Sequence, residues 1–145
     1  MHVTGTVPMA APAEKVWPYL TEPTKVMEWF ANVKRFDWHG EPGLGTPFYW
    51  EEEASGKIYK LNFETTVWEP NRDFAFSMTS GDFFKSYRGR WTLTPTADGC
   101  EFGFEDLIQF PWGPVGMLIG VFAARSSRKT GARIMAELKR LAESS

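Results

Sequence analysis

Between Val33 and Gln109 the sequence repeats one pattern, in which stretches of alternating apolar and polar residues are separated by short clusters of turn-forming residues. Alternation with a period of two is typical of a β-strand with one buried face. The pattern predicts six strands, at Val33–Trp38, Thr46–Ala54, Lys57–Glu69, Asp73–Ser80, Phe84–Thr94 and Cys100–Gln109. A shorter strand is predicted over Val3–Met9. Short turns join neighbours that run antiparallel, so this region is constrained to an antiparallel meander.

Helical signals precede and follow the predicted strands. Pro12 and Glu14 suit the first turn of a helix that ends near Thr21, and Thr24–Phe30 forms a second short helix. Gly113–Glu143 lacks strand alternation and ends in good helix formers, which predicts one long C-terminal helix. The 145 residues are the length of one domain, so we expect a single α+β domain over residues 1–145, with the long helix covering one face of the sheet.

The alternation also assigns side chains to the two faces of the predicted sheet. The inner set is mainly apolar and aromatic: Tyr59, Leu61, Phe63, Thr65, Val67, Phe74, Phe76, Met78, Tyr87, Gly89, Trp91, Leu93, Phe102 and Phe104. The outer set is polar: Lys60, Asn62, Glu64, Arg88, Arg90, Thr92, Glu101 and Glu105.

One face of the predicted C-terminal helix has almost no side-chain volume. Its small residues recur at spacings of three and four: Gly116, Gly120, Ala123, Ala124, Ser127 and Gly131. The chain is also rich in large rings, since its 12 Phe, 7 Trp and 4 Tyr make up 16% of the residues. Such rings, placed opposite a bare helix face, either interdigitate with it in a solid core or leave a ligand-sized cavity.

Charge and hydropathy exclude some partners. The formal net charge of -2 argues against nucleic-acid binding. The longest apolar stretch, Val115–Ala124, is shorter than the roughly 20 residues that span a bilayer, so no stable membrane insertion is expected. The first residues lack a targeting pattern, which makes a cytoplasmic location the default expectation. The basic residues Arg125, Arg128, Lys129 and Arg133 form either a solvated helix face or a contact for an anionic surface or head group.

Nucleophilic and metal chemistry find little support in the sequence. His2 lies near a terminus and His39 in a polar loop, and neither has a fixed serine or cysteine partner in the pattern. Cys100 is more simply a small residue at a strand end than a nucleophile. The three carboxylates of Glu51–Glu53 point alternately to opposite faces of a strand and cannot converge on one ion. We therefore expect neither a metal nor a cofactor.

Two carboxylates share the parity of the inner face. Glu52 follows Phe48 and Trp50, and Asp106 follows Phe102 and Phe104, each at intervals of two. A carboxylate that points into an apolar cavity has a raised pKa and can act as a general acid or base. The more common arrangement is that a bulge or strand end turns such a residue into solvent. If a reaction is catalysed, the candidate residues are Asp106 and Glu52, with Tyr87 as a helper.

The order of the predicted elements, together with several short segments, resembles the START-like (SRPBCC) superfamily, which includes polyketide cyclases, lipid-transport proteins and birch-pollen-allergen-like proteins. The matching segments are Ala11–Trp17, Met27–Phe30, Gly43–Thr46, Val67–Pro70, Gly113–Gly116 and Leu138–Glu143. The resemblance covers nearly the whole chain. It implies a helix-grip fold, in which a curved antiparallel sheet of seven strands surrounds a long C-terminal helix and encloses an apolar cavity.

The resemblance leaves three functions open. The preferred one is binding or transport of a hydrophobic or aromatic small molecule or lipid in the cavity. The alternatives are a cyclase or dehydratase that uses an inward carboxylate, and an interaction protein of the chaperone-ATPase-activator type. The oligomeric state stays open. We expect the ligand to contact Trp29, Phe30, Trp50, Phe63, Phe76, Met78, Trp91, Phe104, Leu118 and Phe122.

Overall fold

The structure is a computed structural model that describes residues 1–54, 56–111 and 131–144. Its strands are β1 (His2–Met9), β2 (Val33–Trp38), β3 (Pro47–Ala54), β4 (Lys57–Glu69), β5 (Asp73–Gly81), β6 (Ser86–Thr96) and β7 (Gly99–Gln109). Its helices are α1 (Ala13–Thr21), α2 (Pro23–Trp29) and residues 131–144, which we call the C-terminal helix. The strands and both short helices fall within two residues of their predicted positions.

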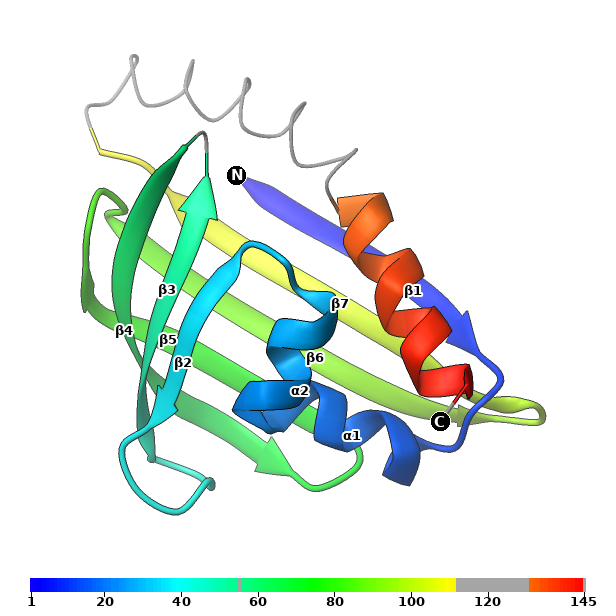
Figure 1. Cartoon of the computed structure of the whole chain (residues 1–145). Coiled ribbons are helices and arrows are strands. Elements are labelled where there is room, and N and C mark those ends of the chain that lie inside the picture. The colour runs from blue at the N-terminus through cyan, green and yellow to red at the C-terminus, as the bar shows by residue number, and fades with distance from the viewer. Residues whose placement is uncertain (55, 112–130, 145) are drawn as a thin grey trace.

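The strands of these described residues form one antiparallel sheet in the order β1-β7-β6-β5-β4-β3-β2. Consecutive strands pair with each other from β2 to β7, and β1 then adds to the free edge of β7. The sheet curls, and α1, α2 and the C-terminal helix lie on one side of it (Figure 1). This is the α+β helix-grip architecture that the sequence predicts. The predicted helix upstream of Gly131, with most of its small residues and basic residues, lies outside the described residues.

The two short helices are fixed to each other and to the sheet by indole N–H groups. The Nε1 of Trp29, at the end of α2, donates a hydrogen bond of 2.6 Å to the carbonyl oxygen of Tyr19 in α1. The Nε1 of Trp38 in β2 donates one of 2.9 Å to the carbonyl oxygen of Thr21. Buried tryptophans need such partners for their N–H groups. These bonds fix the position of Trp29 and of the residues that follow α2.

The faces of the sheet follow the predicted parity with one correction. The outer set is exposed or half-buried, as predicted. The prediction for Val67 is wrong, because the register of β4 against β5 shifts between Thr65 and Val67. Trp68 therefore continues the inner row, with its ring centroid 5.6 Å from that of Phe74. A β-bulge of this kind moves every following side chain to the other face.

One end of the inner face is a solid aromatic core centred on Phe48, which is only 2% exposed. Ring centroids lie 5.0–6.4 Å from that of Phe48 in Phe36, Trp38, Trp50, Phe63, Phe74 and Phe76. These separations are those of stacked and edge-to-face pairs. At this end of the inner face, the sheet rings pack against one another, and most of the small-residue helix face that the sequence places opposite them lies outside the described residues.

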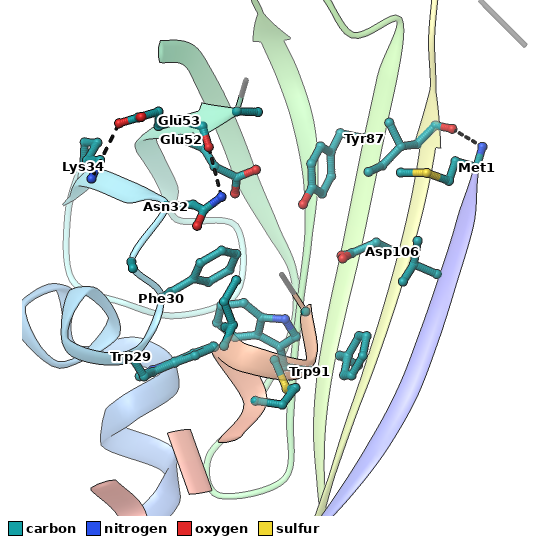
Figure 2. A pocket seen from close by; sticks show the side chains of 18 residues that line it. Met1, Trp29, Phe30, Asn32, Lys34, Glu52, Glu53, Tyr87, Trp91 and Asp106 are labelled. Atoms are coloured by element: carbon teal, nitrogen blue, oxygen red, sulfur yellow. Dashed lines mark hydrogen bonds and ion pairs between the residues drawn. The ribbon is translucent and has the colours of Figure 1, made fainter. Parts of the chain in front are cut away.

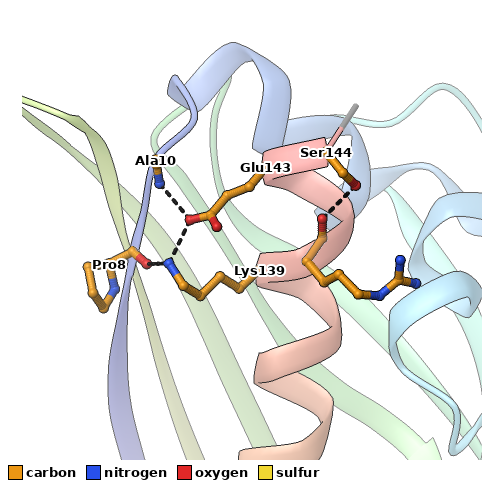
Figure 3. A network of polar contacts seen from close by, with 6 residues as sticks. Pro8, Ala10, Lys139, Glu143 and Ser144 are labelled. Carbon is orange, nitrogen blue, oxygen red and sulfur yellow. Dashed lines mark hydrogen bonds and ion pairs between the residues drawn. The ribbon is translucent and has the colours of Figure 1, made fainter.

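The last turns of the C-terminal helix are fixed to the end of β1 (Figure 3). The Nζ of Lys139 donates a hydrogen bond of 2.9 Å to the carbonyl oxygen of Pro8 and lies 2.6 Å from Oε2 of Glu143. The same Glu143 oxygen accepts a bond of 2.8 Å from the backbone N–H of Ala10. Leu138, the residue before Lys139, is fully buried. The helix is thereby held against the inner side of the sheet near β1.

Candidate functional site

A pocket of about 420 Å³ lies at the other end of the inner face. Its wall is built from β1, the chain that follows α2, the last residues of β3, the middle of β6 and β7, and the C-terminal helix. Gly131, Ile134 and Met135 are the described helix residues on this wall. The inner face is thus divided between a solid aromatic core and a pocket, and Gly131 is the one described residue of the predicted small-residue row that lies on the pocket wall.

Aromatic rings form one side of the pocket: Trp29, Phe30, Trp91 and Phe104. The centroid of Trp29 lies 5.2 Å from that of Phe30 and 5.7 Å from that of Trp91, so these rings support one another as well as the pocket (Figure 2). Large flat side chains with neighbours on one side hold a stable apolar surface on the other. A planar or hydrophobic molecule fits against such a wall.

Three titratable side chains point into the pocket from three different strands: Glu52 from β3, Tyr87 from β6 and Asp106 from β7 (Figure 2). Oε1 of Glu52 accepts a hydrogen bond of 3.1 Å from Nε1 of Trp50. Among the residues that the structure describes, neither the Tyr87 hydroxyl nor the Asp106 carboxyl has a hydrogen-bond partner. As far as the described part of the chain is concerned, their polar atoms are free to meet a molecule in the pocket.

Burial controls the ionisation of these groups. It raises the pKa of Asp106 to about 7, and the negative charges of Glu52 and Glu105 contribute in the same direction. Burial also raises the pKa of Glu52, against the opposing effect of the hydrogen bond from Trp50. The pKa of Tyr87 lies well above its usual value because of burial and the two nearby carboxylates. Near neutral pH, Asp106 is therefore present in both forms and can donate or accept a proton.

Gly89 makes room for the Asp106 carboxyl. The two residues are cross-strand partners on β6 and β7, and Phe76 is the partner of Gly89 on its other side. A Cβ atom at position 89 would lie 2.5 Å from the Phe76 ring and 3.0 Å from Oδ1 of Asp106. A side chain at this position would therefore displace both neighbours.

We expect Gly89→Ala to destabilise the protein by about 1–3 kcal/mol, because overpacking forces the Phe76 ring and the Asp106 carboxyl to move. Urea unfolding measures this change. Gly43→Ala is the matched control, since the nearest atoms to its new Cβ lie 3.9 and 4.0 Å away. An equal effect of the two substitutions would contradict the packing role of Gly89.

The structure divides the residues predicted to contact a ligand. Trp29, Phe30, Trp91 and Phe104 lie on the wall of the pocket together with Glu52, Tyr87 and Asp106. In contrast, Trp50, Phe63 and Phe76 are buried in the aromatic core, Met78 packs against it, and none of these four lies on the described wall. Leu118 and Phe122 lie outside the described residues. Contact of any of these residues with a ligand stays a prediction.

The polar side of the pocket next to β2 was not predicted from the sequence. Asn32 and Lys34 lie there, and Nζ of Lys34 is 3.6 Å from Oε2 of Glu53. Nδ2 of Asn32 also donates a hydrogen bond of 3.1 Å to the carbonyl oxygen of Glu53. The register of β2 shifts between Val33 and Arg35, which no local pattern indicates. The one sequence signal for this polar side is that Asn32 and Lys34 lie only a few positions after Trp29 and Phe30.

Metal-binding and membrane-spanning features are absent from the described residues. No group of three or more His, Cys, Asp or Glu side chains in residues 1–54, 56–111 and 131–144 is arranged to hold a metal ion. No helix in the same ranges is long and apolar enough to cross a bilayer.

A pocket with an aromatic wall, between a curled antiparallel sheet and a C-terminal helix, is typical of helix-grip proteins. The chain belongs to the polyketide cyclase / dehydrase and lipid transport family, whose model matches residues 1–143. A search of curated protein sequences finds no match.

Solved structures share the fold at low sequence identity. TTHA0849 from Thermus thermophilus is 18% identical, with a TM-score of 0.82 over 98% of this chain and 97% of its own. The Zhui aromatase/cyclase from a Streptomyces species is 15% identical, with a TM-score of 0.80 over 99% and 93%. A START superfamily protein from Mycobacterium smegmatis is 15% identical, with a TM-score of 0.77 over 97% and 98%. At these identities the similarity shows the fold alone.

Proposed function

We propose that this protein binds a small hydrophobic molecule with a flat or aromatic part in the pocket between the sheet and the C-terminal helix. One observation carries the proposal: an aromatic wall faces a few inward polar groups across a cavity of about 420 Å³. This volume lies within the range of small-molecule sites, in which apolar walls supply affinity and a small number of polar groups set orientation. The family description, which includes lipid transport, supports the proposal.

Filling the pocket tests this proposal. The probe is tryptophol, a neutral indole alcohol, and its binding is measured by isothermal titration calorimetry. Ile134 lies on the wall of the pocket, and Ile134→Trp places a large ring in the cavity. We expect this variant to bind tryptophol at least about tenfold more weakly than the unchanged protein, a loss of about 1.4 kcal/mol.

Ile58→Trp is the matched control, because Ile58 is an exposed residue of β4 and does not lie on the described wall. We expect this variant to bind tryptophol as the unchanged protein does. Equal binding of tryptophol by the two variants, or an equal loss of binding in both, would contradict the proposal.

We propose proton-transfer catalysis of the cyclase type as a second function, favoured by the position of Asp106 beside Tyr87 and Glu52 in the pocket. In this role Asp106 removes a proton next to a carbonyl group of the ligand, and the Tyr87 hydroxyl donates a hydrogen bond to the carbonyl oxygen. The pKa of Asp106, about 7, suits a group that must both take and return a proton near neutral pH. The aromatase/cyclase among the similar structures supports this second proposal.

Exchange of the α-protons of benzoylacetone in deuterated water, followed by NMR, separates the two functions. A catalyst accelerates the exchange above the buffer rate, with a rise in rate centred near pH 7, and loses the acceleration in Asp106→Asn. A protein that binds benzoylacetone but leaves the exchange at the buffer rate acts as a carrier.

A further inference from the structure

On the described wall of the pocket, the inward-facing charges are unbalanced. Glu52 and Asp106 place two carboxyl groups in it, from opposite sides of the view in Figure 2. Two positive groups belong to residues of the wall, and both have other partners. Nζ of Lys34 lies 3.6 Å from Glu53, and the amino group of Met1 donates a hydrogen bond of 2.6 Å to the carbonyl oxygen of Ile108. Within the described wall, neither inward carboxyl has a cationic partner.

The remaining surfaces of the pocket also favour a positive charge. Trp29 and Trp91 lie on the wall of the same space, and the face of an aromatic ring attracts an ammonium group within about 6 Å. The Tyr87 hydroxyl supplies a third oxygen atom between the two carboxyl groups. A protonated primary amine has three N–H donors, and each of these three side chains offers at least one acceptor oxygen.

We propose that the pocket selects an organic cation: a small molecule that has an aromatic or hydrophobic body and a protonated amine. The amine lies among Glu52, Tyr87 and Asp106, and the body lies against Trp29 and Trp91. This proposal rests on the proposed function, because it requires that the pocket bind a small molecule. It goes beyond that function by naming the charge of the ligand and the residues that select it.

The proposal implies a defined pH dependence. The titratable groups that face Asp106 in the pocket are Glu52 on β3 and Tyr87 on β6, while Glu105, beside it on β7, points to the outer face. The amino group of Met1 and Lys34 are the positive groups of the described wall. The described helix residues on the wall are uncharged. A bound cation stabilises the ionised carboxylates, so it lowers the pKa of Asp106 from about 7 and displaces its proton. Affinity for an amine therefore rises with pH up to about pH 8.

Three indole probes of nearly equal shape test the selection: tryptamine is a cation, tryptophol is neutral and indoleacetate is an anion. Calorimetric titrations are performed at pH 8 and pH 5.5. At pH 8 we expect tryptamine to bind at least about tenfold more tightly than tryptophol, and indoleacetate to bind most weakly. At pH 5.5 the preference for tryptamine shrinks, and titrations in buffers of different ionisation enthalpy show release of a proton on binding.

Neutral variants identify the residues that select the cation. Asp106→Asn and Glu52→Gln each reduce the preference for tryptamine over tryptophol at pH 8 severalfold, and retained tryptophol binding shows that the variants are folded. Glu105→Gln is the control, because this carboxylate is the neighbour of Asp106 on the outer face and is exposed. It should leave the preference unchanged.

The outcomes separate the two proposals. If tryptophol binds as tightly as tryptamine at pH 8, or indoleacetate binds best, selection of a cation is wrong and the proposed function stands. The same conclusion follows if Glu105→Gln reduces the preference as much as Asp106→Asn does. If none of the three probes binds, the proposed function fails as well.

Discussion

Asp106→Asn is expected to stabilise the folded protein at pH 8 while changing its stability little below pH 4. Burial raises the pKa of this carboxyl to about 7, whereas its ordinary value is 3.8. The folded state therefore holds the proton more tightly than the unfolded chain does. This tighter proton binding makes its full contribution to the free energy of unfolding below about pH 4. The contribution is lost as the pH rises through 7. For the full difference in pKa the loss amounts to roughly 4 kcal/mol, and asparagine, which does not ionise, avoids it.

Urea unfolding at pH 4, 6 and 8 measures this effect. The difference in unfolding free energy between Asp106→Asn and the unchanged protein should grow at each step to higher pH. Glu105→Gln removes the adjacent carboxylate, which faces outward, and should produce a much smaller change. A difference that is constant across the pH range would show that Asp106 does not ionise inside the pocket. Retention of a destabilising carboxylate is typical of a site kept for function.

Phe48→Ala is expected to destabilise the protein by about 3–5 kcal/mol, the usual cost of removing a buried phenylalanine ring. The large value is expected because Phe48 is 2% exposed and lies at the centre of the aromatic core. The affinity of the Phe48→Ala variant for tryptophol should remain within about twofold of that of the unchanged protein, since Phe48 is not on the described wall of the pocket.

Leu44→Ala is the control for this substitution, because Leu44 is 73% exposed and its truncation removes little buried surface. Chemical unfolding gives the stabilities, and calorimetry under native conditions gives the affinities. A large loss of tryptophol affinity in folded Phe48→Ala would show that the aromatic core and the pocket act as one unit. Equal stability of the two variants would show that the ring at position 48 is not central to the core.

The fold was predictable because its signals are local. Turn-forming residues such as Pro70 and Asn71 separate stretches with a period of two, and this pattern located each strand to within two residues. Pro12 and Pro23 marked the beginnings of the two short helices in the same way. Parity also placed most side chains on the correct face. It failed after Thr65, where a bulge brings Trp68 inward in place of Val67.

The division of the inner face into core and pocket was not predictable in the same way. Trp50 and Trp91 have the same residue type and the same inward parity, yet Trp50 packs in the aromatic core and Trp91 also borders the pocket. The curl of the whole sheet and the position of α2 determine which of the two tryptophans borders the pocket. No local sequence pattern encodes the curl or the position of α2. Parity alone also could not determine whether Glu52 and Asp106 face solvent, which is the more common arrangement, or the pocket, where the structure places them.

The pairing of β1 with β7 has a consequence for how the molecule is made. Its cross-strand partners are about a hundred positions apart, from Met9 with Cys100 to His2 with Leu107. A ribosome adds roughly 5–20 residues each second, so the first strand waits about 5–20 seconds before its partner has been synthesised. The hairpins from β2 to β6 can assemble during this interval. β1 therefore joins the sheet late in biosynthesis. The part of the pocket wall that β1 supplies is completed at the same time.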